Sequence, residues 1–204
     1  IPVWSYCKLH VYALQEEPFL HIDGDVVLRQ PFEPAVNTAP LVVQQLEAGK
    51  PYYHDVVQKV NQYCHYLPQA YARYQSEHPV VDAYNMGTFG GQDIEFIRAY
   101  AQEAKKFVSE NLQHLPLLEA TPFTTLAEQH ILHCMAREQQ IPVYLLAHGA
   151  GFNSPQSVRW APYIHPIWRY KSSPVVCQVL EQMLKVMHPE YYYKIDYLLK
   201  HQKL

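Results

Sequence analysis

Residues 19–25 read Phe-Leu-His-Ile-Asp-Gly-Asp, an apolar stretch that runs into two acidic residues around a glycine. Residues 19–22 are typical of a short buried strand. In open α/β sheets, ligands bind beyond the carboxyl ends of strands, which is where Asp23 and Asp25 lie. Carboxylates two residues apart in an extended segment can point the same way. They suit a hard divalent cation such as Mn²⁺ or Mg²⁺. We interpret this D-x-D segment as a metal site, although Asp-Gly-Asp is also good turn chemistry.

Predicted strands and helices alternate along the chain after this segment. Further extended segments are expected over 79–89, which closes on a Gly-Gly pair, and over 142–147. Apolar residues at helical spacing predict one helix over 55–67 and another that begins after Asp93 as its N-cap. This alternation predicts an α/β domain whose mostly parallel sheet is flanked by helices.

The second half of the chain carries two patterns typical of helix starts. Thr125-x-x-Glu128 is a capping-box pattern, and Ser173-Pro174 is a cap followed by proline at the first helical position. We expect one domain over residues 1–204, with C-terminal helices over 173–204.

Composition excludes several classes of protein. The 16 Lys and Arg and 19 Asp and Glu residues give a net charge of −3, without the basic excess expected of a nucleic-acid binder. The apolar runs are too short for a transmembrane helix, and no signal peptide is visible. No C-x-x-C pair occurs, which is typical of reduced thiols in a cytoplasmic protein. The cysteines are Cys7, Cys64, Cys134 and Cys177.

Two further segments carry residues suited to a ligand site. Residues 84–91 combine Asn85, whose amide can donate and accept hydrogen bonds, with small residues that let a ligand approach the backbone. A strand that ends in a glycine turn explains the same segment equally well. Residues 159–171 mix cations and aromatic residues around His165, and such cations can bind phosphate oxygens. A covering loop packed on the core is the alternative interpretation.

His130 and His133 are three residues apart in a predicted helix and share one face. Their spacing differs from the H-E-x-x-H of zinc proteases. With no third ligand assigned beside them, we interpret both histidines as structural.

The order of these features resembles the metal-dependent glycosyltransferases of the GT-A fold, above all the glycogenin and lipopolysaccharide-galactosyltransferase family. In that family the two aspartates of D-x-D hold Mn²⁺, which bridges the diphosphate of a nucleotide sugar. Asp23 and Asp25 match these aspartates. The family's Asn and Gly near the donor sugar match Asn85 and Gly87.

The resemblance extends to about residue 171. The family's acidic residue and glutamine beside the reacting sugar match Glu128 and Gln129. Its late H-x-x-G-x-x-K signature implies that His165 is a third metal ligand and that Lys171 binds phosphate. Trp168 stands in place of the signature glycine, and Arg169 is a second candidate phosphate-binding cation.

The resemblance implies a partial GT-A fold that lacks most of the N-terminal nucleotide-binding half. It also implies Mn²⁺- or Mg²⁺-dependent sugar transfer, with retained configuration, from a nucleotide-diphosphate donor to a hydroxyl acceptor such as a carbohydrate. A non-catalytic binding protein is one alternative, favoured by Trp168. A metal-dependent phosphoesterase is another, with Asp23, Asp25 and His165 as ligands. The Tyr- and Lys-rich C-terminal helix is a candidate for peripheral membrane contact.

Overall fold

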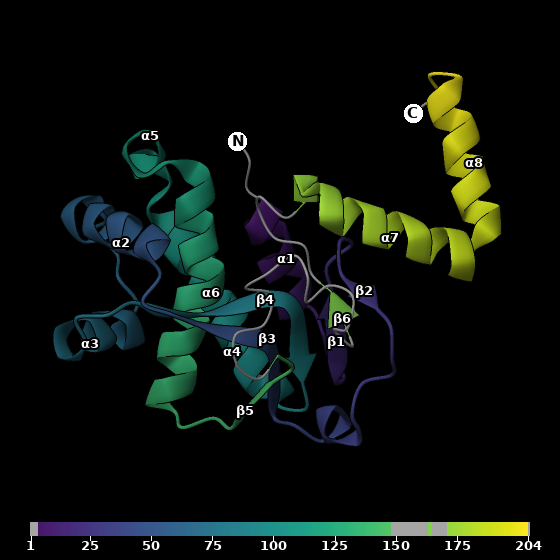
Figure 1. Ribbon diagram of the computed structural model, residues 1–204. Helices are drawn as coiled ribbons and strands as arrows, with labels where there is room; N and C mark the ends of the chain where they lie inside the picture. Colours follow the sequence, from purple (N-terminus) through teal and green to yellow (C-terminus); the bar gives the residue numbers. More distant parts are fainter. Residues whose placement is uncertain (1–3, 148–162, 165–170, 204) are drawn as a thin grey trace. The chain divides into compact units, whose positions relative to one another are not determined.

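The computed structural model describes residues 4–147, 163–164 and 171–203 of the chain (Figure 1). Contacts between Cα atoms divide the chain into two compact units. Unit 1 comprises residues 1–23 and 32–149, and unit 2 comprises residues 24–31 and 150–204. The chain therefore leaves unit 1 after Asp23 and returns to it at Phe32.

Unit 1 is built on a four-stranded mixed sheet with the strand order β1-β4-β3-β5. Strand β4 is antiparallel to both β1 and β3, whereas β5 is parallel to β3. The predicted α/β class is confirmed, but the prediction of a mostly parallel sheet is wrong. The strands are β1 (Phe19–Ile22), β3 (Leu41–Ala48), β4 (Asp82–Gly91) and β5 (Val143–Leu145).

A pair of helices between β3 and β4 explains the antiparallel pairing. A single helix carries the chain back to the opposite end of a sheet and gives a parallel neighbour. Here α2 (Pro51–Tyr63) and α3 (Gln69–Glu77) follow one another, and the chain re-enters the sheet where it left, with Ala48 paired to Asp82. The sequence predicted the first helix over 55–67, ended by Pro68, but α2 starts earlier and already ends at Tyr63, before the proline. A new helix begins directly after this proline.

The remaining helices of unit 1 bury the sheet. These are α1 (Trp4–Ala13), α4 (Ile94–Glu110) and α6 (Ala120–Glu138), together with the short elements η1 (Pro34–Asn37), η2 (Leu112–His114) and α5 (Leu115–Leu118). Helix α6 packs on β4, and α1, α4 and α6 contact one another. Leu41 and Val43 join this main core, whereas Val42 points to the other face, as the two-residue period of a strand requires.

Helix α4 follows its sequence pattern closely. The Asp93 side chain accepts a hydrogen bond from Phe96 N at 3.0 Å, which confirms the predicted N-cap. The whole predicted apolar face is buried in the core. That face consists of Phe96, Ile97, Tyr100, Ala104, Phe107 and Val108.

The predicted capping box of Thr125 and Glu128 is wrong. Helix α6 already begins at Ala120, so both residues lie inside it. Glu128 is fully buried and points into the protein instead of bonding back to the helix start. The Thr125-x-x-Glu128 spacing therefore does not mark a helix start. Glu128 is instead a buried acidic residue of the candidate site.

Asn111, which follows α4, makes four hydrogen bonds from a fully buried side chain. Its Oδ1 accepts from His65 N and Tyr66 N, and its Nδ2 donates to Tyr66 O and Phe107 O. We expect Asn111→Ala to destabilise the protein by about 2–4 kcal/mol, because buried backbone groups lose their partners. Urea unfolding measures this loss. Gln113→Ala, at an exposed neighbour, is the control, and an equal effect of both changes would contradict the prediction.

Unit 2 pairs β2 (Val27–Leu28) with β6 (Tyr163–Ile164) and adds α7 (Pro174–Met187) and α8 (Pro189–Lys200). Helix α7 begins with Pro174 at its first position, as Ser173-Pro174 predicted, although Ser173 makes no side-chain cap bond. Val176 is buried against Val27 and against apolar residues of its own helix. Among the described residues, no helix is both long and apolar enough to cross a membrane.

Candidate functional site

A lysine joins two acidic side chains inside unit 1. Lys8 comes from α1, Asp23 follows β1, and Glu128 comes from the middle of α6. The Lys8 Nζ lies 2.7 Å from Asp23 Oδ1 and donates to Glu128 Oε1 at 3.2 Å. Glu128 is completely buried, whereas Lys8 and Asp23 keep a small exposed fraction, 16% and 19% of their side chains. The cluster therefore reaches from the protein interior to the solvent.

The charges of this cluster stabilise one another. Burial alone would lower the pKa of Lys8, but the neighbouring Glu128 and Asp23 carboxylates outweigh it and raise the pKa. Burial likewise opposes ionisation of Asp23, yet hydrogen bonds from His21 Nε2, 2.9 Å away, and from Lys8 hold its pKa below its usual value. Burial raises the pKa of Glu128 in spite of Lys8. Glu128 thus depends on Lys8 to carry its charge.

Several buried polar atoms beside Glu128 lack partners. Among the described residues, Glu128 Oε2, Ser5 Oγ and Tyr12 Oη make no hydrogen bond of good geometry. The Ser5 hydroxyl favours the ionised form of Glu128. Burial raises the pKa of Tyr12, and the Glu128 carboxylate raises it further. The three groups are therefore neighbours. Unsatisfied buried polar atoms are uncommon in proteins and often mark the place of a water, ion or ligand.

A second group of polar side chains comes from β3, α2, β4 and α6. Asn85 Nδ2 donates to Glu47 Oε1 at 3.3 Å, and its Oδ1 accepts from Gly87 N at 3.1 Å. The Tyr53 hydroxyl lies 2.8 Å from Glu47 Oε2 and also contacts the Gln129 side-chain amide. Burial raises the pKa of Tyr53, and the hydroxyl stays protonated.

A backbone bond joins the two groups. Asp23 N donates to Gly87 O at 2.8 Å, next to an irregularity of the β3–β4 ladder between Val43 and Gln45. Such irregularities are over-represented beside active sites, because they re-aim side chains. Unit 1 thus brings together many of the residues matched to the transferase pattern, from widely separated parts of the chain. These residues are Asp23, Asn85, Gly87, Glu128 and Gln129.

The other matched residues belong to unit 2. Asp25 Oδ2 and Lys171 Nζ form an ion pair at 2.5 Å, so the predicted metal ligand and the predicted phosphate-binding lysine contact each other. His165 and Arg169 lie outside the described residues. Their predicted roles as metal ligand and phosphate-binding cation remain predictions from the sequence.

Comparison with known proteins adds a family. The sequence matches a family of unknown function, DUF6734, over residues 2–198. The chain belongs to this family. No curated protein and no solved structure was found to match it.

Sequence reasoning missed Lys8, Tyr53 and Glu47 in this DUF6734 chain. For Lys8 a signal existed, because Ser5, Lys8 and Tyr12 share one face of a helix whose neighbouring residues are mostly apolar. A lone cation on a buried helix face needs an acidic partner. For Tyr53 and Glu47 no spacing in the sequence indicated a polar role.

Asp23 is the matched metal ligand that lies in unit 1. Its carboxylate already contacts the Lys8 ammonium and the His21 ring, so a metal ion must compete with these groups. Carboxylate oxygens are hard ligands of the kind that Mn²⁺ and Mg²⁺ prefer. A metal at Asp23 would share the carboxylate with Lys8 or displace it.

His130 and His133 are both buried in α6 of this DUF6734 chain, as the structural interpretation expects. Burial lowers the pKa of each imidazole to about 4. Tyr74 packs edge-on against both rings. They lie apart from the candidate site, since none of their hydrogen bonds reaches Lys8, Asp23 or Glu128 among the described residues.

A cavity of about 410 Å³ opens elsewhere in unit 1, beside α2 and the start of α6. Its wall includes Asp55, Lys59 and Glu119, and Lys59 forms an ion pair with Glu119. None of the residues matched to the transferase pattern lines it, so the candidate site is the Lys8–Asp23–Glu128 cluster.

Proposed function

We propose that this member of DUF6734 transfers a sugar from a nucleotide-diphosphate donor to an acceptor hydroxyl, with a partial GT-A fold. The observation that carries the proposal is the convergence of Asp23, Asn85, Gly87, Glu128 and Gln129 on one hydrogen-bonded network. Polar atoms without partners lie at its buried end. A packed core has no need for such a network, whereas a polar ligand such as a sugar does.

The proposed metal is Mn²⁺ or Mg²⁺. Asp23, Asp25 and His165 are the residues that would hold it. When bound, the ion supplies a Lewis acid that stabilises negative charge on the departing diphosphate. Lys171 and Arg169 would add positive charge for the same diphosphate.

The residues around Glu128 would act on the sugar. Its free Oε2 would stabilise the positive charge that develops at the anomeric carbon as the leaving group departs. Burial raises the pKa of Glu128, and the neighbouring Lys8 ammonium favours its ionised form. Asn85 and Gln129 carry amides that can donate to and accept from sugar hydroxyls, which fixes the orientation of the donor. Tyr53 holds the Gln129 amide in place.

A panel of nucleotide sugars with Mn²⁺ tests the proposal, with release of nucleoside diphosphate as the readout. We expect release with one class of donor, and we expect Glu128→Gln to slow it by about a hundredfold or more, since an electrostatic stabiliser is lost. The amide still accepts from Lys8, so the fold should persist. Glu110→Gln, at an exposed position of α4, is the matched control.

Other outcomes would contradict sugar transfer. Metal-dependent cleavage of phosphate esters in the absence of any sugar would indicate a phosphoesterase. If Glu128→Gln and Glu110→Gln released nucleotide at the same rate, Glu128 would have no part in the reaction.

A non-catalytic binding protein is the second candidate function. It is favoured by the Lys8 ammonium, which already bonds to both Asp23 and Glu128 and leaves less charge for a metal to neutralise. Calorimetry with nucleotide sugars separates the two functions. Binding without release of nucleoside diphosphate under any metal condition would support the binding protein.

A further inference from the structure

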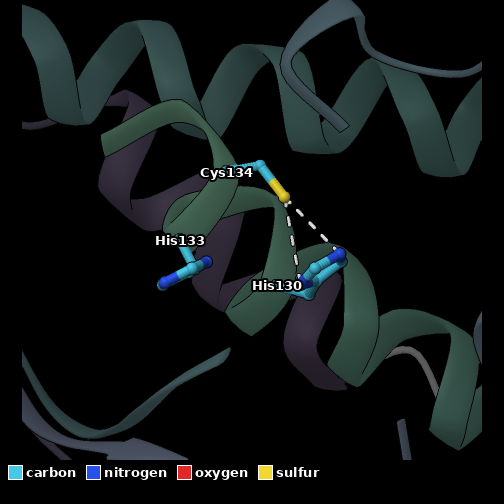
Figure 2. A group of neighbouring side chains, drawn as sticks. All are labelled: His130, His133 and Cys134. Atoms are coloured by element: carbon cyan, nitrogen blue, oxygen red, sulfur yellow. Dashed lines mark hydrogen bonds between the residues drawn. The ribbon is translucent and has the colours of Figure 1, made fainter. Parts of the chain in front are cut away.

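Helix α6 carries a second cluster, His130, His133 and Cys134, on two of its successive turns (Figure 2). One ligand atom from each residue lies within 4.8 Å of the other two. All three side chains are buried, with 0%, 5% and 1% of their surface exposed. The interpretation of the two histidines as structural left out Cys134, which supplies the third ligand atom.

The hydrogen bonds of His130 fix which ring nitrogen carries the lone pair. Its Nδ1 lies 2.6 Å from Asp82 O. A carbonyl oxygen can only accept, so Nδ1 carries the proton and Nε2 keeps its lone pair. Metal-binding histidines usually donate their other N–H to a carbonyl or carboxylate in this way, which orients the ring.

The thiol of Cys134 lies beside the His130 ring, 3.5 Å from Nε2 and 3.9 Å from Nδ1. Figure 2 shows the sulfur near both nitrogens of the ring, and Nε2 is the closer of the two. In a tetrahedral zinc site, ligand bonds of about 2.3 Å to sulfur and about 2.0 Å to nitrogen put the two ligand atoms about 3.5 Å apart. Cys134 Sγ and His130 Nε2 therefore already have this separation, and binding requires only that the His130 ring turn its Nε2 lone pair toward the ion.

His133 completes the set. Among the described residues its Nδ1 has no hydrogen-bond partner, although the atom is buried. The larger separations within the cluster, up to 4.8 Å, involve this residue, because His130 and Cys134 are closer. Metal binding must therefore draw the His133 ring toward the other two ligands. No hydrogen bond is broken at Nδ1 by this movement, but the ring must shift against Tyr74 and Tyr84.

We propose that His130 Nε2, His133 and Cys134 Sγ bind one Zn²⁺ ion. Two imidazoles and a thiolate are the ligands of a borderline-soft cation and disfavour Mn²⁺ and Mg²⁺. The Cys134 proton leaves to solvent on binding, so the ion and thiolate carry a net single positive charge. Asp82, which is electrostatically coupled to both histidines, compensates it. The Gln75 Nε2 atom lies 2.9 Å from His130 Nε2, and this amide must move away when the metal or a fourth ligand binds.

Cobalt is the probe, because it replaces zinc and its bond to a thiolate has an intense near-ultraviolet charge-transfer band. We expect the purified full chain, stripped of metal, to bind one equivalent of Co²⁺ with this band, and Zn²⁺ to displace it. Cys134→Ser should abolish the band and weaken zinc binding by about a hundredfold or more. Loss of even an outer-sphere partner of a metal ligand costs about 10- to 100-fold. Cys64→Ser, at a half-buried thiol, is the matched control and should keep the band.

Circular dichroism of Cys134→Ser checks that the fold is retained, and serine preserves the volume of the side chain. The proposal is overturned if the wild-type chain shows no cobalt–thiolate band, or if Cys134→Ser keeps the band. It does not depend on sugar transfer. Asp25→Ala and excess Mn²⁺ should leave the band unchanged, and loss of the band in Asp25→Ala would place the bound metal elsewhere.

Discussion

Lys8→Met is expected to destabilise the protein by about 3–5 kcal/mol, because it leaves Glu128 as an uncompensated charge in the interior. Methionine nearly preserves the length of the side chain, so little packing is lost. Urea unfolding gives the change in free energy, and Lys194→Met, at an exposed position of α8, is the control. The double variant Lys8→Met with Glu128→Gln should recover much of the loss, since it removes both charges.

The effect of Lys8→Met should depend on pH in a defined direction. Burial already raises the pKa of Glu128 above its ordinary value of 4.5, and loss of the lysine raises it further. A carboxyl with a raised folded-state pKa favours folding below its unfolded pKa, and this contribution is lost as pH rises through the folded pKa. The variant should therefore be closest to wild type at and below pH 4.5, the ordinary pKa of the group, and should lose stability relative to wild type as the pH rises above it. A penalty independent of pH would show that packing, not charge, is lost.

Gly91→Ala is expected to cost roughly 4 kcal/mol or more, which is exceptional for one substitution. Gly91 ends β4 with φ +139°, a conformation that side-chain-bearing residues rarely adopt, and a Cβ there would lie 2.2 Å from Pro40 O. The obstacle is backbone at the start of β3, so it cannot turn aside. At Gly90, a Cβ would lie 2.0 Å from the backbone oxygen of Phe19 in β1. The glycine pair thus lets both neighbouring strands approach the end of β4.

Gly24→Ala provides the contrast, since a Cβ there meets nothing within 4 Å. We expect it to unfold within about 0.5 kcal/mol of wild type, as surface substitutions usually do. Thermal unfolding of both variants is the measurement. Equal midpoints for Gly91→Ala and wild type would mean that the strands separate at no cost.

Local signals in the sequence predicted local structure well. The apolar run over 19–22 is β1, with the same bounds, and Asp93 caps α4 as expected. Each of these features depends on residues within a few positions, where strand period and capping chemistry act directly. Asp23, Asn85 and Glu128 were grouped only through a resemblance, since no local rule relates such distant residues.

What the sequence did not predict depends on long-range geometry. The direction of β4 follows from the second helix of a pair, and a strand pattern contains nothing about direction. Thr125 and Glu128 have the spacing of a helix cap but lie within α6, where burial of Glu128 against Lys8 determines their role. The partners of Lys8 come from two other elements, so only the folded chain reveals them.

The pairing of β2 with β6 in unit 2 affects how this chain can form on a ribosome. Val27 pairs with Ile164, and most of unit 1 is translated after Val27 and before Ile164. Because synthesis proceeds from the N-terminus, residues 24–31 emerge early and wait for a partner strand that has not yet been translated. The nascent chain can therefore assemble the sheet of unit 1 first. Residues 24–31 can form their β2–β6 pairing only after residue 164 leaves the exit tunnel.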